Sequence, residues 1–325
     1  MSGQGSVLVT CGHLLRNYAD FAHVLADAGL GVATPKLESQ QFTADELIAL
    51  LPGHDVIIAG DDDVSAAVLD SAPNLKAVIR WGIGTNNVDR PASERLGIPC
   101  YNTPGAFNEE VADLALGLTI AICRQIPQIH AQVSAGAWPR IEGTSLAGKT
   151  AGCVGLGGIG LATCRRLAAC GMEVIGTDPR ALPADVLAAN GVAEQVSLED
   201  LAARVDILVL ACELTPENRH MVGKDLLART RPGLRLVNVA RGPLVDEAAL
   251  VAALESGHVA AAALDVFEDE PMAQDNPLRQ FDQCVFGSHG GSSTREAIAR
   301  VNLKTVEMAR DMLTGADLSA YNRVF

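Results

Sequence analysis

Aromatic and basic residues are both scarce in this sequence. The 325 residues include only 2 tryptophans, 3 tyrosines and 7 phenylalanines, and 25 lysines and arginines stand against 39 aspartates and glutamates. A net charge of −14 repels nucleic acid and anionic lipid, and few side chains are available to stack on bases. We therefore expect no nucleic-acid partner and no membrane partner.

Long apolar runs and paired cysteines are also missing. No run approaches the roughly 20 residues of a membrane span, and residues 1–6 lack the basic and apolar regions of a signal peptide. We therefore expect a cytoplasmic protein. The eight cysteines contain no C-x-x-C pair. They predict neither a metal site nor a disulfide framework, and we expect small buried hydrophobic residues.

Short apolar segments alternate with amphipathic ones in the first hundred residues. Strands are expected at 7–10, 55–60, 75–79 and 98–101, and helices at 18–28 and 64–71. Strands separated by helices indicate crossover units and a parallel sheet. Residues 1–101 are therefore expected to form a small, flavodoxin-like α/β domain.

A second α/β series begins at residue 150, after a long helix expected from Asn108 to about residue 126, before Pro127. Its six expected strands lie at 150–154, 173–177, 207–211, 234–239, 260–265 and 283–287. Six strands are the number in two mononucleotide-binding halves, which predicts a doubly wound Rossmann domain over 102–290. A helix expected at 294–313 is placed to return to the first domain. That domain is then discontinuous, with 1–101 completed by 291–325.

A glycine fingerprint follows the first strand of this series. Gly155, Gly157 and Gly160 form G-x-G-x-x-G, with Gly158 and Ile159 inside it. A strand before the motif and a helix after it predict a pyrophosphate site at the helix N-terminus. The simpler alternative is a glycine-rich turn without a ligand.

An acidic residue ends the next expected strand. Asp178 lies 18 residues after Gly160, close to the roughly 20 expected for the acid that binds the ribose hydroxyls. A carboxylate there repels a 2′-phosphate, so NAD is favoured over NADP, although Arg180 lies nearby.

Three later segments place titratable residues just after expected strands. Arg241 follows the strand at 234–239, Asp265 and Glu270 follow the next strand, and His289 follows the last one. In doubly wound sheets, ligands bind at the carboxyl ends of the strands.

These segments, in this order, resemble the D-isomer-specific 2-hydroxyacid dehydrogenase family, in the branch similar to D-3-phosphoglycerate dehydrogenase. The resemblance rests on the fingerprint, on the three segments above, and on residues 81–89, 102–113 and 214–217. It implies a hydride transfer between NAD(H) and a small D-2-hydroxy or 2-oxo acid, of the glyoxylate/hydroxypyruvate type or the 3-phosphoglycerate type.

The resemblance also assigns catalytic roles. Arg241 corresponds to the arginine that binds the substrate carboxylate and polarises the 2-oxo group, for which its planar fork is suited. His289 corresponds to the group that moves a proton at the 2-oxygen, and Glu270 to its carboxylate partner. Taken singly, each is more often an ordinary surface or structural residue.

Further contacts are implied in the same way. Asp265 matches a position beside the nicotinamide carboxamide. The backbone of Gly82, Ile83 and Gly84 matches a loop that donates N–H groups to the substrate carboxylate. The helix from Asn108 and the arm at 138–144 match the family's dimer-forming region, so a homodimer is expected.

Three departures from the family pattern stand out. Gly158 replaces a frequent arginine or histidine, which shifts pyrophosphate binding toward backbone donors. Glu213 replaces a usual proline, with no effect that the sequence explains. The acidic loop at 60–63 stands where phosphoglycerate-type relatives tend to carry arginines. Three aspartates repel a phosphate, which favours a substrate with an uncharged tail unless Arg80 or Arg140 compensates.

Other functions remain open at this point. The architecture and the triad are shared with C-terminal-binding corepressors, so an NAD-sensing binding protein without physiological turnover is the alternative. Formate dehydrogenase resembles the chain less, because it carries glutamine where Glu270 stands, and phosphite dehydrogenase is disfavoured.

Overall fold

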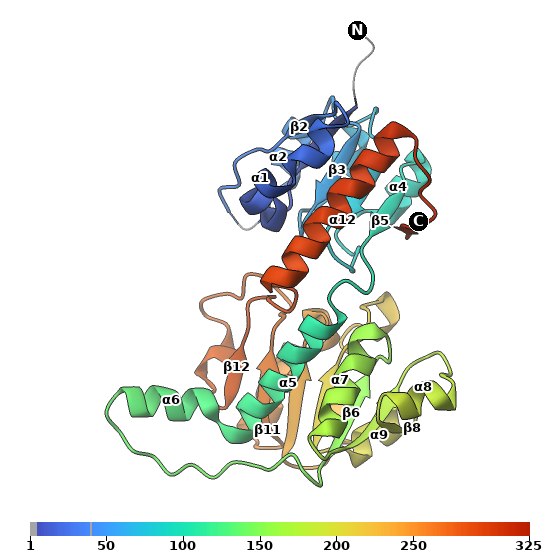
Figure 1. Ribbon diagram of the computed structural model, residues 1–325. Helices are drawn as coiled ribbons and strands as arrows, with labels where there is room; N and C mark the ends of the chain where they lie inside the picture. Colours follow the sequence, from blue (N-terminus) through green and yellow to red (C-terminus); the bar gives the residue numbers. More distant parts are fainter. Residues whose placement is uncertain (1–4, 40) are drawn as a thin grey trace. The chain divides into compact units, whose positions relative to one another are not determined.

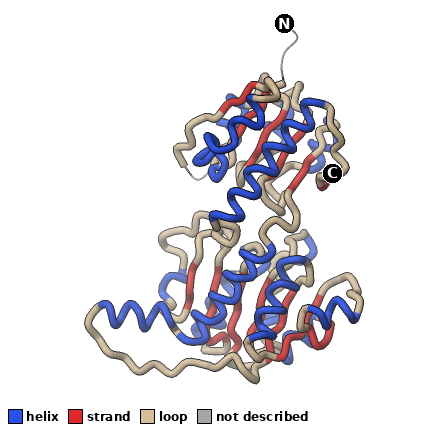
Figure 2. The backbone as a smooth tube through the Cα atoms, viewed as in Figure 1, coloured by secondary structure: helices blue, strands red, loops and turns tan. Residues whose placement is uncertain are grey.

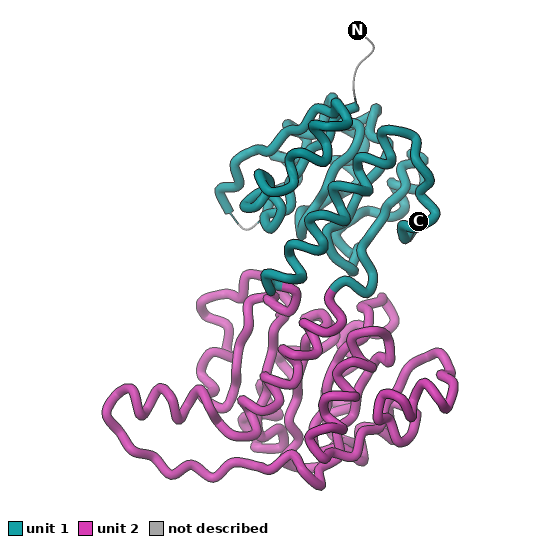
Figure 3. The backbone as a smooth tube through the Cα atoms, in the orientation of Figure 1, with its two compact units in different colours: residues 1–106, 293–325 teal, residues 107–292 magenta. Residues whose placement is uncertain are grey.

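The chain forms two compact units (Figure 3). The structure, a computed structural model, describes residues 5–39 and 41–325, so part of the segment considered for a signal peptide lies outside the described residues. Unit 1 consists of residues 1–106 and 293–325, and unit 2 of residues 107–292. The sequence placed the corresponding boundaries at 101/102 and 290/291.

Unit 1 is built on a six-stranded sheet. Its strands are β1 (Ser6–Val9), β2 (Gly31–Ala33), β3 (Val56–Ala59), β4 (Ala77–Arg80), β5 (Cys100–Asn102) and β13 (Asn322–Arg323). They run in the order β13-β5-β4-β3-β1-β2, and only β13 is antiparallel to its neighbour. The parallel strands thus follow the 2-1-3-4-5 order of flavodoxin-like folds.

Five helices accompany this sheet in the described residues. They are α1 (Gly12–Ala26), α2 (Ala44–Leu50), α3 (Ala66–Asp70), α4 (Arg90–Leu96) and α12 (Arg295–Thr314). Helix α12 lies beside α1 and against β3 and β4 (Figure 1). The side chains of Val301, Val306 and Met308 on this helix are fully buried. The last segment of the chain therefore supplies part of the core of unit 1.

Unit 2 contains one parallel sheet of seven strands. They are β6 (Thr150–Val154), β7 (Glu173–Thr177), β8 (Val192–Gln195), β9 (Ile207–Leu210), β10 (Leu234–Asn238), β11 (Val259–Leu264) and β12 (Cys284–Phe286). The order β12-β11-β10-β9-β6-β7-β8 is the doubly wound 3-2-1-4-5-6 order with one more strand after the sixth. The predicted Rossmann class is confirmed, but the count of six strands was wrong because β8 was missed.

Helices flank the strands of unit 2 (Figure 2). They are α5 (Asn108–Arg124), α6 (Ile126–Ser134), α7 (Gly158–Ala169), α8 (Ala184–Ala189), α9 (Leu198–Arg204), α10 (Lys224–Leu227) and α11 (Glu247–Glu255), with 3-10 turns η1 (Pro216–Asn218), η2 (Gly242–Leu244) and η3 (Pro277–Gln280). Helix α5 packs beside α7.

The first long helix of unit 2 ends differently from the prediction. Gln125 adopts a left-handed conformation with φ 50°, and the chain then starts α6 with Pro127 in its first turn. Proline is tolerated there because the N–H it lacks would have no partner in the helix. The break is therefore made by Gln125, and Pro127 begins a helix instead of stopping one.

Other differences concern short or half-exposed elements. Helix α1 begins at Gly12, six residues before the expected start, and β2, β13, α2 and α4 were not expected.

Six cysteines are buried as expected, whereas Cys170 and Cys212 are half-buried. Within 5–39 and 41–325, no cluster of three or more His, Cys, Asp or Glu side chains is arranged to hold a metal ion. No helix in those ranges is both long and apolar enough to span a membrane.

Candidate active site

The strands of unit 2 deliver the predicted site residues to one edge of the sheet. Backbone pairing aligns one residue from each of six strands in a row: Thr177, Val154, Leu210, Asn238, Leu264 and Phe286. Five predicted site residues follow this row by one to three positions: Gly155, Asp178, Arg241, Asp265 and His289. They therefore share the carboxyl edge of a doubly wound sheet, where ligands bind.

The glycine fingerprint forms the turn from β6 into α7. Gly155 has φ 93°, and a Cβ there would lie 2.7 Å from the Cα of Cys212. A Cβ on Gly160 would overlap the carbonyl oxygen of Gly155, whereas one on Gly157 meets no atom within 4 Å. Gly157 is the N-cap of α7, and Gly158 and Ile159 are its first two residues. The open space beside Gly157, at the N-terminus of this helix, fits a dinucleotide pyrophosphate.

Gly158 is accounted for by a neighbour from another helix. A Cβ at this position would overlap the side chain of Asn108, the first residue of α5. The side-chain amide of Asn108 thus lies over the first turn of α7. Sequence reasoning missed Asn108 because its partner lies fifty residues away in the chain.

Asp178 lies at the end of β7 with its carboxylate already hydrogen-bonded. Its Oδ2 accepts the N–H of Leu156 at 2.8 Å, and Arg180 donates from its backbone N and from Nε to Oδ1 at 3.0 and 2.9 Å. Burial alone would raise the pKa of Asp178, but the hydrogen bonds and charge of Arg180 outweigh it and hold this pKa below its usual value. The acid is therefore an anion at neutral pH.

His289 and Glu270 are brought together after β12 and β11. Nδ1 of His289 lies 2.7 Å from Oε2 of Glu270, and Oε1 of Glu270 accepts the N–H of Phe267 at 3.0 Å. An ionised carboxylate only accepts hydrogen bonds, so Nδ1 carries the proton in this pair. The backbone of His289 has φ 56°, a conformation that non-glycine residues adopt mainly at turns and functional sites.

Asp265 holds the loop that carries His289. Its Oδ1 and Oδ2 accept the N–H groups of Gly290 and Gly291, each at 3.0 Å, and its carbonyl oxygen accepts the N–H of His289 at 2.7 Å. Asp265 is 3% exposed. Burial raises the pKa of Asp265, against the two N–H donors, which lower it. The predicted cofactor residue thus also positions the histidine loop.

Arg241 follows the neighbouring strand, β10. Its Nη1 donates to the carbonyl oxygen of Ala240 at 2.7 Å, and Asn238 donates from its side chain to the carbonyl oxygen of Arg241 at 2.9 Å. Asn238 is 1% exposed and was not predicted. Asn238 therefore holds the backbone of Arg241 in place. The signal in the sequence is an asparagine at the end of an apolar strand.

A carboxylate network outside the prediction fixes the segment that precedes Glu270. Glu268 accepts from the backbone N of Glu247 at 2.9 Å and lies 3.0 Å from Nε2 of His220, while Glu247 accepts from the backbone N of Glu268 at 2.8 Å. These reciprocal bonds tie the loop after β11 to the start of α11.

The predicted substrate loop, Gly82 to Gly84, belongs to unit 1 and follows β4. Gly82 has φ 140° and donates to Oγ1 of Thr103 at 3.2 Å, while Thr103 donates from its backbone to the carbonyl oxygen of Gly82 at 2.9 Å. Asn102 donates to the carbonyl oxygen of Ile83 at 2.6 Å. Asn102 and Thr103 therefore position this loop, and they lie in one of the segments that carried the family resemblance.

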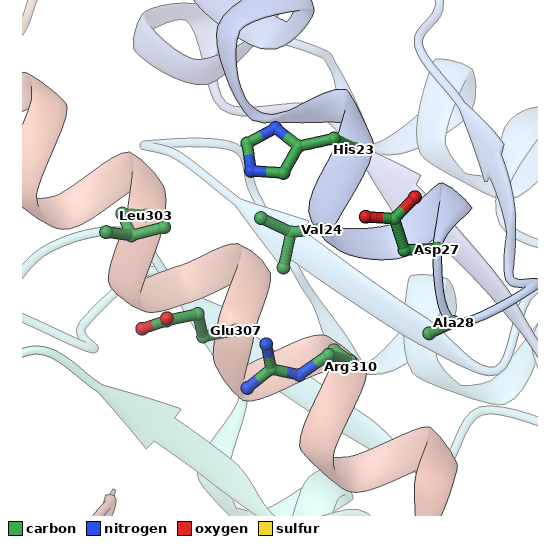
Figure 4. A pocket seen from close by; sticks show the side chains of 7 residues that line it. All are labelled: His23, Val24, Asp27, Ala28, Leu303, Glu307 and Arg310. Carbon is green, nitrogen blue, oxygen red and sulfur yellow. The ribbon is translucent and has the colours of Figure 1, made fainter.

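A groove elsewhere on unit 1 contains none of the predicted residues. It lies between α1 with its C-terminal end and α12, and is lined by His23, Val24, Asp27, Ala28, Leu303, Glu307 and Arg310 (Figure 4). Arg310 is paired with Asp311 at 2.8 Å. The groove is not part of the candidate active site.

Comparison with known proteins defines the class to which the chain belongs. Residues 116–291 match the family described as D-isomer specific 2-hydroxyacid dehydrogenase, NAD binding domain. This range includes Arg241, Glu270 and His289. The chain belongs to this family, and the match confirms the prediction of NAD as the cofactor.

Individual relatives and solved structures resemble most of the chain. The chain is 42% identical over 274 residues to D-3-phosphoglycerate dehydrogenase of Mycobacterium bovis, covering 83% of this chain and 51% of the relative. It thus spans about half the length of the curated relatives it matches. A solved protein from Thermus thermophilus superposes with a TM-score of 0.84 and 32% identity, covering 98% of this chain and 100% of that one. A glyoxylate reductase from Paecilomyes thermophila gives a TM-score of 0.86 at 28% identity, covering 100% and 99%.

Proposed function

We propose that the protein is an oxidoreductase that transfers a hydride between NAD(H) and a small D-2-hydroxy or 2-oxo acid. The observation that carries the proposal is the contact of 2.7 Å between His289 and Glu270 at the sheet edge that also bears the glycine fingerprint. In this proposal unit 2 is the dinucleotide-binding domain and unit 1 the substrate domain. The names of the relatives support the same reaction class.

The residues of the chain divide the work as follows. NAD, when bound, accepts or supplies the hydride. Nε2 of His289 takes the hydroxyl proton during oxidation and returns it during reduction, because Nδ1 is engaged by Glu270. The Glu270 carboxylate stabilises the imidazolium that forms, and the Arg241 guanidinium binds the substrate carboxylate. The backbone N–H groups of Gly82, Ile83 and Gly84 keep the role of substrate contacts that the family resemblance implies.

A substrate panel tests the reaction. Purified protein is assayed for NADH oxidation with glyoxylate, hydroxypyruvate and pyruvate, and for NAD reduction with 3-phosphoglycerate. We expect turnover of at least one of these acids. A folded protein that binds NADH, turns over none of them and captures a protein partner only with NADH present would instead be the NAD-sensing binding protein.

The role of His289 has its own test. His289→Ala should lower kcat by about 10²- to 10⁴-fold, the usual effect of losing a proton-transfer group. His23→Ala, on the exposed side of α1, is the matched control and should keep full activity. Near-normal turnover by the His289 variant would refute the assignment.

We further propose that the protein is cytoplasmic and forms a homodimer without a nucleic-acid partner. Trp138 lies on the arm between α6 and β6 and is 83% exposed, which supports a covered position in an assembly. Light scattering should give twice the chain mass of 33.9 kDa, and Trp138→Glu should shift the protein to monomer. A monomeric wild type would contradict the proposal.

A further inference from the structure

The strands of unit 1 also end in register and gather polar side chains at one edge. Val9, Ile58, Ile79 and Tyr101 pair in a row across β1, β3, β4 and β5. Asp61, Arg80 and the loop at 82–84 follow this row within five positions, and His13 follows β1 in the first turn of α1. In an open parallel sheet this is the edge at which ligands bind.

Arg80 is a buried cation directly against the substrate loop. Its side chain is 7% exposed, and Nη1 lies so close to Gly82 that a Cβ on that glycine would sit 2.8 Å away. Nη1 donates to the carbonyl oxygen of Trp81, and Nε donates to Asn87 at 3.2 Å. A lone buried cation here would give the loop a positive potential and attract any second anionic group on a ligand.

Asp61 cancels that potential. Its Oδ1 pairs with Nη2 of Arg80, while the Asp61 side chain is itself 62% exposed. The carboxylate therefore neutralises the guanidinium on one side and presents negative charge to solvent on the other. A ligand with an anionic tail meets this carboxylate instead of a free guanidinium fork.

The three consecutive aspartates are not equivalent. Asp62 is 1% exposed, and its carboxylate accepts from Thr10 Oγ1, Gly60 N and Phe42 N at 2.7, 2.9 and 2.8 Å, so it holds the loop together. Asp63 is exposed to solvent. The sequence attributed phosphate repulsion to all three, whereas only Asp61 is paired with Arg80.

The histidine of the cluster does not restore positive charge next to Arg80. The ring of His13 stacks on that of Trp81 with centroids 4.7 Å apart. Burial, and next the charge of Arg16, lower the pKa of His13, against the opposing effect of Asp61. The ring is therefore neutral at physiological pH.

We propose that Asp61 is a specificity-determining residue. By neutralising Arg80 against the loop at 82–84, it makes the site accept a 2-oxo acid with an uncharged tail and reject one with a phosphate tail. This inference rests on the proposed dehydrogenase function. In this proposal Arg80 holds the loop through its hydrogen bond to Trp81, and Asp61 determines which class of substrate is accepted.

The test compares two substrates within each variant. We measure kcat/KM with NADH for hydroxypyruvate and for 3-phosphohydroxypyruvate, and take their ratio, so that any inactive fraction of a preparation cancels. Wild type should prefer hydroxypyruvate. Asp61→Asn should shift the ratio toward the phosphorylated acid by about tenfold or more, because the guanidinium is then uncompensated.

Two further variants separate local from general charge effects. Asp63→Asn removes the same charge two residues away on the exposed part of the loop and should change the ratio less than about twofold, because exposed charges are screened. Asp61→Glu keeps the charge and should keep the wild-type ratio. The Tm of each Asp61 variant is measured by thermal unfolding. Comparing the two variants shows whether a loss of stability accompanies the change in the ratio.

The outcomes distinguish this inference from the function on which it rests. If wild type reduces neither acid nor any other 2-oxo acid, both fall. If wild type reduces hydroxypyruvate but Asp61→Asn leaves the ratio unchanged, or Asp63→Asn shifts it equally, the role of Asp61 is wrong and the dehydrogenase stands. A wild type that prefers the phosphorylated acid also overturns it.

Discussion

Asp178 and Arg180 form an ion pair that we expect to favour NAD over NADP. The Asp178 side chain is 6% exposed, and its carboxylate accepts three hydrogen bonds within 3.0 Å, two from Arg180 and one from the backbone N–H of Leu156. The Arg180 side chain is 68% exposed. The arginine is therefore free to leave the carboxylate when ribose hydroxyls take its place. A 2′-phosphate would instead meet the buried anion.

Removing this anion should relax cofactor choice. Wild type should bind NADH more tightly than NADPH, and Asp178→Gly should reduce that preference by about tenfold or more, because the Arg180 guanidinium is then available to a phosphate. Fluorescence titration with both cofactors measures the change. Asp185→Asn, at an exposed position of α8, is the charge-matched control. A wild type that prefers NADPH would contradict this role for Asp178.

His13 should contribute a pH dependence of stability. Its pKa is lowered in the folded protein from the usual 6.5, chiefly by burial and next by Arg16. The unfolded chain therefore binds more protons at acidic pH, so stability is full above about pH 6.5 and decreases as the pH falls from there through the folded-state pKa.

The measurement is the change in Tm between about pH 7.5 and about pH 5.5. It should be larger in wild type than in His13→Gln, which cannot take up the proton. His23→Gln, at an exposed position of α1, should behave as wild type does. Equal changes in wild type and His13→Gln would show that His13 does not carry the effect.

At the scale of elements, the loop after β12 depends on the strand beside it. Asp265 at the end of β11 receives the N–H groups of Gly290 and Gly291, and its main-chain carbonyl receives that of His289. A Cβ on Gly287 would overlap the Asp265 carboxylate. The left-handed backbone of His289 is thus maintained by contacts from β11.

Asp265→Asn should loosen this loop. An amide has one accepting oxygen, so one of the two N–H groups would face an NH₂ group, and a lost buried hydrogen bond of this kind costs about 1–3 kcal/mol. We expect a lower Tm and a larger fall in kcat than rise in KM. Asp275→Asn, at an exposed position before η3, is the control. A kcat equal to that of wild type would exclude this positioning role.

The sequence predicted those elements whose burial is complete. All four residues of β3 and all four of β9 are buried, and the corresponding apolar runs were recognised. Strand β8 was missed because Ala193 and Glu194 are exposed at the sheet edge, so no apolar run marks it. Elements of two to four half-exposed residues leave too few positions for a periodic signal.

The same distinction applies to the candidate site. Arg241, Glu270 and His289 were predicted because each follows a strand in the family order. Neither the position of Asn108 over Gly158 nor the choice of Asp61 over its two neighbours as partner of Arg80 was predictable. Such pairings depend on the direction of single side chains across distant segments, which local pattern does not encode.

At the scale of the molecule, unit 1 is completed by the end of the chain. Helix α12 packs on α1, β3 and β4, its Asn302 accepts a hydrogen bond from Trp81 Nε1 at 2.8 Å, and β13 pairs with β5. Unit 2, in contrast, is one continuous segment.

Deleting residues 293–325 should therefore unfold one unit and spare the other. Removal of α12 exposes the sheet face against which it packs, so β3 and β4 should lose protection in hydrogen exchange. Strands β6 and β9 should keep theirs, and NADH binding should persist. Retained protection of β3 and β4 in the truncated chain would contradict the contribution of α12 to the core.

The two segments of unit 1 are separated in the sequence by unit 2, so they are synthesised at different times. At about 5–20 residues per second, a ribosome needs on the order of 10–40 s to translate residues 107–292. During that interval strands β1 to β5 have already been synthesised, but the helix that packs on their sheet, α12, has not. All of unit 2 is synthesised before α12. We therefore expect the first 106 residues to expose an apolar sheet face during synthesis, a kind of surface that chaperones of nascent chains recognise.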